Sequence, residues 1–588
     1  MHREPIFNEV RNVPDFADME TILRQNYDDA VPAQLWHEWN IIFSRCGVHQ
    51  GCNFGSFCAA LGLQPVLREV AATMSSGMLL AYMDDVRIVG PAHVAIPAYL
   101  RLKDLALRRL GVVEVPSKGG VMWFGEGSPD LFGLPQDMPG VQHRLTHDKL
   151  LGVFVGDSRP VSITAIKVAL ATKFSSRAAI LDSLPSISDP DVKIQLLRCC
   201  ISTRPGFWLR TMDPELTHDA AAAFDTRVRT SLSDICNTAA LPPVSWDFAT
   251  LPNSLGGLGI ISQSGTSHAA HLASWSSAWA NICLMFPLAI RISAADLDTC
   301  ALPFAWGIRG AHQHVEAAAA AVRANPDNVP LPPNAIHDPV VPGTADLATR
   351  LSHAQRRFAF VVHSAKWMRS FTMASIPHRA RILSNSGWGA MAAFGAVPSD
   401  NFRVVPVSYV AALQLRLRLP LTLLVGLTKC VCGSQLDEFG DHIFSCSHFV
   451  HERTPGHDLI EAVVARMGKQ AGKDVKVDSK RLRVRSIAYS PHHQPDITFL
   501  HGQPDASHTI IDIVTPSVVT VGRVARAAAS RLVAAEGAEA HKRGVFGNIL
   551  GNTLSRALRY RGWRLLGQGG SWALQAPPVV LREPGPLP

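Results

Sequence analysis

The sequence predicts a multidomain α+β protein, and three observations lead to this fold class. The chain has 588 residues, which at roughly 100 to 200 residues per domain corresponds to about three to five domains. Hydrophobic residues make up 47% and charged residues 18%, a balance that supplies several cores and argues against disorder. Helix-type and strand-type periodicities also alternate along the chain and change character at several points.

The sequence shows no sign of a membrane or secreted protein. No apolar run approaches the ~18 residues of a membrane-spanning helix, and the opening residues MHREPIFNEVRN lack the apolar core of a secretory signal. The 11 Cys are scattered and do not form a disulfide framework. We therefore expect no membrane partner and a reducing intracellular compartment.

Residues 1–157 combine both kinds of pattern. An Ala- and Leu-rich stretch at 54–74 predicts a helix, and MLLAYMDDVRIVG at 78–90 predicts a β-hairpin. A second helix is expected near 95–110, followed by two short strands. This part of the chain is therefore expected to form an α+β unit.

The rest of the chain divides by composition. Residues 158–324 are mainly helical, with a turn marked by the glycines of LPNSLGGLGI. Five further stretches follow: a Pro-rich linker at 325–343, a second helical segment at 344–425, a Cys/His-rich segment at 426–458, strands at 484–520 and an Ala-rich helix at 522–543.

The net charge of +8 lies entirely near the C-terminus, where residues 451–588 contain 19 Lys and Arg against 11 Asp and Glu. Such asymmetry suggests a part that binds a polyanion, most naturally nucleic acid. The alternative is a solvated basic surface.

Two adjacent carboxylates, Asp84 and Asp85, interrupt the hairpin pattern where its turn is expected. A turn of this kind can present carboxylate oxygens to Mg²⁺, a hard ion that prefers oxygen ligands. The alternative is a solvated acidic turn without a ligand.

Four residues in the spacing C-x-C-x9-H-x3-C form the second candidate site: Cys430, Cys432, His442 and Cys446. Three thiolates and an imidazole suit tetrahedral Zn²⁺. The first spacing is tight, so the chain is expected to fold over Gly433. His448 is a substitute ligand, and two buried free thiols are the alternative.

A third candidate site combines Asp496, which begins the strand-like PDITFL, with Asp512, which lies inside TIIDIVTP. Carboxylates on two neighbouring strands can share one face of a sheet and bind Mg²⁺. The alternative is that both residues cap strand ends.

The ordered motifs together resemble a known family. GVHQG at 47–51, AYMDD at 81–85, the VPSKGG segment that contains Lys118, and LLGVFVG at 150–156 resemble, in this order, motifs B, C and D and the primer grip of the reverse transcriptase palm of non-LTR retrotransposons. PIFNEVRN at 5–12 resembles the segment that follows the first metal-binding Asp of that palm.

The resemblance implies two-metal polymerase chemistry, in which one ion activates the primer hydroxyl and the other stabilises the leaving oxygens. It implies roles for seven residues: Asp84 as metal-binding carboxylate, Asp85 as its close neighbour, Lys118 facing the leaving pyrophosphate, and Phe7, Gln50, Gly51 and Tyr82 lining the nucleotide and template site.

One position departs from the family pattern. Counting back from Phe7 places His2 where the first metal-binding Asp is expected. The expectation is an N-terminally truncated polymerase that lacks its fingers and has little or no activity.

Residues 158–280 have the length and pattern of a polymerase thumb, and LPNSLGGLGI followed by HAAHLASW resembles the segment after the thumb in the same proteins. Lys167, Lys173 and Arg177 could contact nucleic-acid phosphates from this region. The alternative is a solvated helix face.

The C-terminal motifs resemble the same family. CVCGSQLDEFGDHIFSC is similar to its CCHC knuckle, and the acidic pair resembles the core of restriction-like endonucleases, where Mg²⁺ and a Lys act on the scissile phosphate. The usual Asp-x-Lys is missing because residue 514 is Val514. Lys542 matches a Lys carried on the following helix, and Glu461 is a weaker metal ligand.

The resemblance covers nearly the whole chain. It implies six parts: a partial reverse transcriptase palm (1–157), a helical thumb and connector (158–324), the Pro-rich linker (325–343), a helical connector (344–425), the CCHC zinc knuckle (426–458) and an α/β restriction-like endonuclease (459–588).

The expected function is that of a retrotransposon-derived RNA-directed DNA polymerase and endonuclease whose intact relatives carry out target-primed reverse transcription. Mg²⁺ and Zn²⁺ are the expected cofactors, DNA and RNA the expected partners, and the nucleus the location that the resemblance implies. The alternative is a non-catalytic remnant that only binds nucleic acid.

Overall fold

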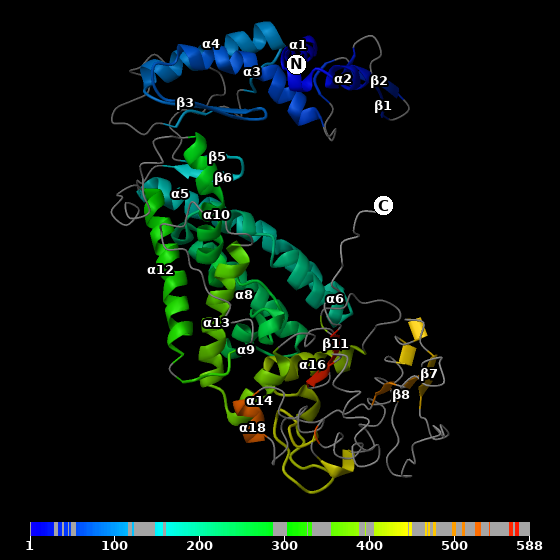
Figure 1. Cartoon of the computed structure of the whole chain (residues 1–588). Coiled ribbons are helices and arrows are strands. Elements are labelled where there is room, and N and C mark those ends of the chain that lie inside the picture. The colour runs from blue at the N-terminus through cyan, green and yellow to red at the C-terminus, as the bar shows by residue number, and fades with distance from the viewer. Residues whose placement is uncertain are drawn as a thin grey trace, which may run out of the picture. The chain divides into compact units, whose positions relative to one another are not determined.

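The computed structural model shows a mainly helical protein with small antiparallel sheets, a mixed α+β architecture as expected (Figure 1). The chain divides into two compact units, Met1–Ile166 and Lys167–Pro588. The residues that the structure describes are 2–28, 33–37, 40–44, 46–48, 54–115, 120–122, 147–156, 160–285, 303–325, 327–331, 354–386, 394, 405–444, 446–449, 465–466, 469–470, 474–477, 497–500, 509–511, 524–530, 540, 564–568 and 571–575.

The first unit contains four α-helices and three hairpins within the described residues. Its helices are α1 (Glu4–Asn12), α2 (Met19–Tyr27), α3 (Gly55–Thr73) and α4 (Ala92–Leu110). Its strands are β1 (Ala33–His37), β2 (Asn40–Ser44), β3 (Met78–Tyr82), β4 (Asp85–Val89), β5 (His147–Leu150) and β6 (Val153–Gly156).

The hairpin β3–β4 packs on α3 and α4, and strand alternation decides which side chains are covered. Leu79 and Ile88 are paired across the hairpin and pack against the apolar core of the two helices. Met78, Leu80 and Tyr82 alternate with the covered residues and are 40%, 37% and 57% exposed. The expected helices, hairpin and later strand pair are therefore confirmed in this unit.

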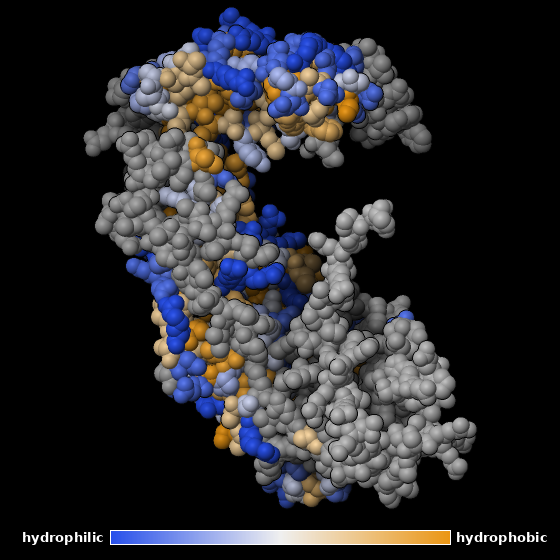
Figure 2. Space-filling model, viewed as in Figure 1, coloured by the Kyte–Doolittle hydropathy of each residue, from blue (hydrophilic) through white to orange (hydrophobic). Residues whose placement is uncertain are grey.

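A second apolar core joins α1 and α2 to the start of α3. Phe7, Leu23 and Cys58 are buried there. Arg3 is buried beside this core and donates from Nε to the carbonyl of Gly47 at 2.9 Å. In Figure 2, hydrophilic residues lie beside hydrophobic ones on the visible face of α4, as expected for an amphipathic helix.

The second unit is built mainly from helices. They are α5 (Pro160–Ala178, which crosses the unit boundary), α6 (Pro190–Gln195), α7 (Gly206–Thr211), α8 (Pro214–Ile235), α9 (Pro243–Ala249), α10 (Gln263–Met285), α12 (Pro303–Ala324), α13 (Ala354–Thr372), α14 (Ile376–Asn385), α16 (Pro406–Leu417) and α18 (Val524–Ala529). Its strands are β7 (Asp474–Val477), β8 (Ile497–Leu500), β9 (Thr509–Ile511), β10 (Arg564–Gln568) and β11 (Ser571–Gln575).

One apolar core of the second unit lies among α10, α12 and α13, which run side by side in Figure 1. Leu272, Ile308 and Phe358 contribute one buried side chain each from the three helices. A buried carboxylate fixes the start of α10: Asp225 on α8 accepts from the backbone N–H of Gln263 at 2.7 Å and from the Ser262 hydroxyl at 2.8 Å. Such a cap satisfies donors that a helix start otherwise leaves unpaired.

Two elements of this unit lie near sites discussed below. Residues Leu196–Ile201 form a π-helix, and β7, β8 and β9 form an antiparallel sheet in that order. Within the expected 522–543 helix, the structure describes α18, which ends before a bend at Ser530, and the helical Ala540. Ala527 and Ala528 of α18 are buried against Ala380 of α14. No helix of the described residues is both long and apolar enough to cross a lipid bilayer.

Candidate metal centre

The short C-x-C spacing folds back on itself as the sequence predicts. The N–H of Cys430 donates to the carbonyl of Ser434, and the N–H of Gly433 donates to the carbonyl of Cys430, both at 2.8 Å. Gly433 has φ 86°, in the left-handed region that favours glycine. The turn brings Cys430 and Cys432 to the same side of the loop despite their near adjacency in sequence.

The second pair of ligands is placed by a carboxylate and a helical turn. Asp437 accepts backbone N–H donors from Phe439 at 3.0 Å, Asp441 at 3.0 Å and His442 at 3.2 Å, which closes the loop before the histidine. The N–H of Cys446 then donates to the carbonyl of His442 at 2.8 Å. This i to i+4 contact puts the two side chains on one face.

The four side chains converge on one point. Cys430 Sγ lies 3.7 Å from Cys446 Sγ, and Cys432 Sγ lies 3.1 Å from His442 Nε2. All four ligand atoms lie within 4.8 Å of one another. A tetrahedron with metal–sulfur bonds of about 2.3 Å has edges of about 3.8 Å, so the cluster fits a metal ion such as zinc.

The electrostatics also suit a cation. Hydrogen bonds from the side chain and backbone of Ser434 lower the pKa of the Cys432 thiol to about 6, which favours the thiolate that a metal requires. Burial opposes ionisation of Asp437, but its backbone donors outweigh burial and lower the pKa of that carboxyl. Cys430 and Cys446 are 7% and 3% exposed, so the sulfur side of the cluster is shielded from solvent.

The cluster is attached to the helical part of the unit. Arg381 on α14 forms an ion pair with Asp441 and also donates to the carbonyl of Phe439 at 3.4 Å. The N–H of Leu421 donates to the carbonyl of Glu438 at 2.8 Å. Gly440 has φ 71°, and a Cβ there would lie 2.9 Å from Leu421 Cδ1. The positive φ favours glycine at this position, and the loop packs closely against the Leu421 side chain, which follows α16.

His448, the substitute ligand, is exposed and does not belong to the convergent group. Within the described residues, the three thiols and His442 are the one group of three or more His, Cys, Asp or Glu side chains placed to share a metal ion.

The aspartate pair lies at the tip of the β3–β4 hairpin, but the two residues occupy different positions. Met83 and Asp84 form the two-residue turn, and Asp85 is the first residue of β4, paired with Tyr82. Met83 has φ 55°, a conformation that L-residues rarely adopt. Asp84 and Asp85 are both exposed.

The hairpin β5–β6 lies beside this turn-bearing hairpin. Arg87 on β4 approaches Asp148 of β5 at 3.4 Å and donates to the carbonyl of Lys149 at 3.3 Å. The two hairpins that carry AYMDD and LLGVFVG are therefore joined by a cross-hairpin ion pair.

The other residues expected at this site have different surroundings. The ring of Phe7 is 3% exposed, with the Arg24 guanidinium 4.1 Å from its centroid, whereas Tyr82 is 57% exposed on the outer face of the hairpin. Gln50, Gly51 and Lys118 lie outside the described residues.

The structure describes strands next to the third candidate site but not the site residues themselves. Asp496, Asp512, Lys542 and Glu461 are outside the described residues. The neighbouring strands β8 and β9 are antiparallel, and their register pairs Ile497 with Ile511.

The basic residues expected to contact phosphates lie on α5. Lys167 pairs with Asp219 at 3.8 Å, and the Arg177 guanidinium lies 5.8 Å from the ring centroid of Trp208. Lys173 is half-buried. Two of these three cations therefore have partners within the protein.

Sequence reasoning missed the residues that support the metal centre, namely Asp437, Arg381 and Gly440. Asp437 had a readable signal, because an Asp shortly before a turn commonly accepts backbone N–H donors. Arg381 had none, since it lies 60 residues from the Asp441 that it binds.

Comparison with known proteins finds no family model that matches the chain, and no curated protein matches it.

Proposed function

We propose that this protein processes nucleic acid in the manner of non-LTR retrotransposon proteins, as an RNA-directed DNA polymerase and endonuclease whose polymerase is defective. The observation that carries the proposal is the convergent set of three thiols and one imidazole, in the C-x-C-x9-H-x3-C spacing. In sequence it follows a hairpin tipped by two aspartates and precedes a sheet next to a second acidic pair.

The metal centre has a structural role in this proposal. Cys430, Cys432, His442 and Cys446 supply four protein ligands, which leaves zinc no open position for a substrate and is typical of structural sites. Bound zinc would hold the loop in one conformation against α14. The position where the basic C-terminal segment begins would then be fixed relative to that helix.

The proposed catalytic residues of the endonuclease are Asp496, Asp512 and Lys542. Asp496 directly precedes Ile497 in sequence and Asp512 directly follows Ile511, and the register pairs Ile497 with Ile511. Two carboxylates would hold Mg²⁺, which activates water against a DNA phosphate, and a lysine would stabilise the charge that develops.

The polymerase defect is proposed from a residue identity. His2 occupies the position that the family resemblance gives to a metal-binding Asp, and an imidazole is a poor ligand for Mg²⁺. The His2 ring packs beside Gly111 at the end of α4. A Cβ added at Gly111 would lie 2.7 Å from Nε2 of His2. We propose that Asp84 and Asp85 alone do not hold both catalytic ions.

The endonuclease is tested by incubating the full-length chain with supercoiled plasmid DNA and Mg²⁺ and measuring nicked circles. We expect nicking that chelation of Mg²⁺ abolishes and that the double variant Asp496→Ala, Asp512→Ala lacks. The double variant Asp474→Ala, Asp478→Ala removes the same charge from the same region and should nick normally. Equal nicking by all three proteins would refute the assigned residues.

The alternative is a non-catalytic protein that binds nucleic acid through the zinc loop and the basic C-terminal segment. The excess of 19 basic over 11 acidic residues in 451–588 favours binding in either case. The same assay separates the two proposals, because the non-catalytic protein would shift DNA in a gel, more weakly at high salt, without ever cutting it. A nuclear location is part of both proposals.

A further inference from the structure

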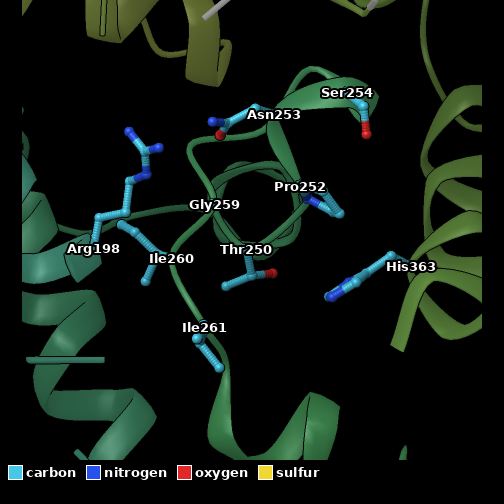
Figure 3. A pocket seen from close by; sticks show the side chains of 9 residues that line it. All are labelled: Arg198, Thr250, Pro252, Asn253, Ser254, Gly259, Ile260, Ile261 and His363. Carbon is cyan, nitrogen blue, oxygen red and sulfur yellow. The ribbon is translucent and has the colours of Figure 1, made fainter. Parts of the chain in front are cut away.

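A pocket of about 400 Å³ opens in the helical part of the second unit, away from the metal centre in sequence (Figure 3). Its walls come from the π-helix, from the stretch between α9 and α10, and from α13. The lining includes Arg198, Pro252, Asn253, Ile260, Ile261 and His363.

Three polar atoms in this pocket are buried and lack a hydrogen-bond partner among the described residues: Arg198 Nη1, Asn253 Oδ1 and His363 Nδ1. A buried polar group without a partner costs about 1–3 kcal/mol, and more when it is charged. Figure 3 shows that they belong to side chains from three different segments around one space. A ligand that pairs with them would recover this cost.

The backbone around the pocket is unusual in two places. Arg198 lies on the π-helix Leu196–Ile201, a conformation that is rare and often found at functional sites. Gly259 has φ 73°, and a Cβ there would lie 2.8 Å from Asn253 Oδ1 and 3.4 Å from Arg198 Nε. The positive φ favours glycine at this position, and a side chain here would crowd the Asn253 amide.

Charge narrows the choice of ligand. Arg198 is the one charged residue among the nine that line the pocket. Lys366, just outside it, is already engaged with the Thr250 hydroxyl at 2.7 Å and with Asp247 at 2.8 Å. Burial, followed by the nearby Lys366 charge, lowers the pKa of His363 to about 4, so its ring is neutral at pH 7. The pocket therefore presents one cation, neutral polar groups and an apolar wall.

This combination matches a phosphate ester joined to a flat, polar-edged group. The guanidinium of Arg198 suits a phosphate, which it can bind with two parallel hydrogen bonds. Pro252, Ile260 and Ile261 offer apolar surface to a ring, and the unpaired nitrogen of His363 can donate to or accept from its edge. The volume falls within the range of small-ligand pockets, about 300–1,000 Å³.

We propose that this pocket binds one nucleotide unit, with its phosphate on Arg198 and its base against Pro252, Ile261 and His363. The unit is either a free nucleotide or the phosphorylated end of a nucleic acid strand, which share this chemistry. The site does not depend on the proposed nuclease or polymerase, because it uses none of their residues.

Calorimetric titration of the full-length chain tests the proposal with four probes: adenosine 5′-monophosphate, adenosine, inorganic phosphate and a 5′-phosphorylated tetranucleotide. We expect a phosphorylated nucleoside to bind at least about tenfold more tightly than adenosine or phosphate alone. Arg198→Gln should weaken that binding by about 10- to 100-fold, because the variant loses the positive charge and one of the two hydrogen bonds to the phosphate. Arg204→Gln removes the same charge from an exposed position nearby and should leave the affinity unchanged.

A second variant controls for the possibility that Arg198→Gln weakens binding by unfolding the protein. Asn253→Asp is isosteric and places an anion in the pocket wall, so it should leave the fold intact and weaken phosphate binding by at least about tenfold. Binding of the free nucleotide identifies a nucleotide site, and binding of the tetranucleotide alone identifies a strand end. No binding by the unmodified chain, equal binding of phosphate alone, or equal effects of Arg198→Gln and Arg204→Gln would overturn the proposal.

Discussion

Replacing Arg381 by alanine should detach the metal-binding loop from α14. The Arg381 and Asp441 side chains are only 11% and 20% exposed, so Asp441 would be left with a poorly solvated charge. Burial already raises the pKa of Asp441 although Arg381 acts to lower it, which shows how much this carboxylate needs its partner. Breaking a buried ion pair by removing one member costs about 3–5 kcal/mol; for this partly exposed pair we expect about 2–3 kcal/mol.

Hydrogen exchange measured in the native state, with zinc supplied, reports the loss. Because protection of an amide depends exponentially on the local opening free energy, the backbone N–H groups of residues 428–444 should exchange about 30- to 150-fold faster in Arg381→Ala. Arg323→Ala is the matched control, since its ion pair with Glu316 is 51% and 41% exposed and should contribute less than about 1 kcal/mol. Equal protection of the loop in the two variants would refute the reasoning.

Three further predictions concern other parts of the chain. Cys446→Ser should reduce bound zinc from about one per chain to almost none after dialysis against a chelator, whereas the exposed Cys200→Ser should keep it; retention by Cys446→Ser would exclude this residue as a ligand. Asp225→Asn should lower stability by about 2 kcal/mol, because an amide nitrogen replaces an oxygen that accepts backbone N–H and serine O–H donors; an unchanged melting temperature would contradict this role. Burial lowers the pKa of His271 to about 4 from 6.5, so unfolding takes up a proton between these values and stability falls as the pH falls through this window. The melting temperature should fall less between neutral pH and about pH 5 in His271→Gln than in the unmodified chain. An equal fall in the two proteins would contradict the role of His271.

Much of the local structure could be predicted from periodicity and turn residues. The segment expected as a helix at 54–74 is α3, Gly55–Thr73, because its apolar residues recur at helical spacing. The hairpin around the aspartates is predicted by the two strand-like runs on either side of them, but the turn expected at Asp84 and Asp85 lies one residue earlier. The turn is Met83–Asp84, and a Met with φ 55° is not a residue that turn statistics suggest.

The metal ligands were also predictable, because four side chains within 17 residues constrain one another locally. What could not be predicted is their support. Arg381 approaches the loop from a helix, and no pattern in sequence signals a contact across 60 residues. The pocket around Arg198 was missed likewise, since its residues span positions 198 to 363 and only the glycines of LPNSLGGLGI stood out.

X-ray absorption at the zinc K-edge of the purified, zinc-loaded chain tests the metal centre most directly, and the proposed function depends on that centre. The convergence of Cys430, Cys432, His442 and Cys446 predicts three sulfur neighbours at about 2.3 Å and one nitrogen at about 2.0–2.1 Å. A shell dominated by oxygen or nitrogen, or a chain that binds no zinc, would contradict the account.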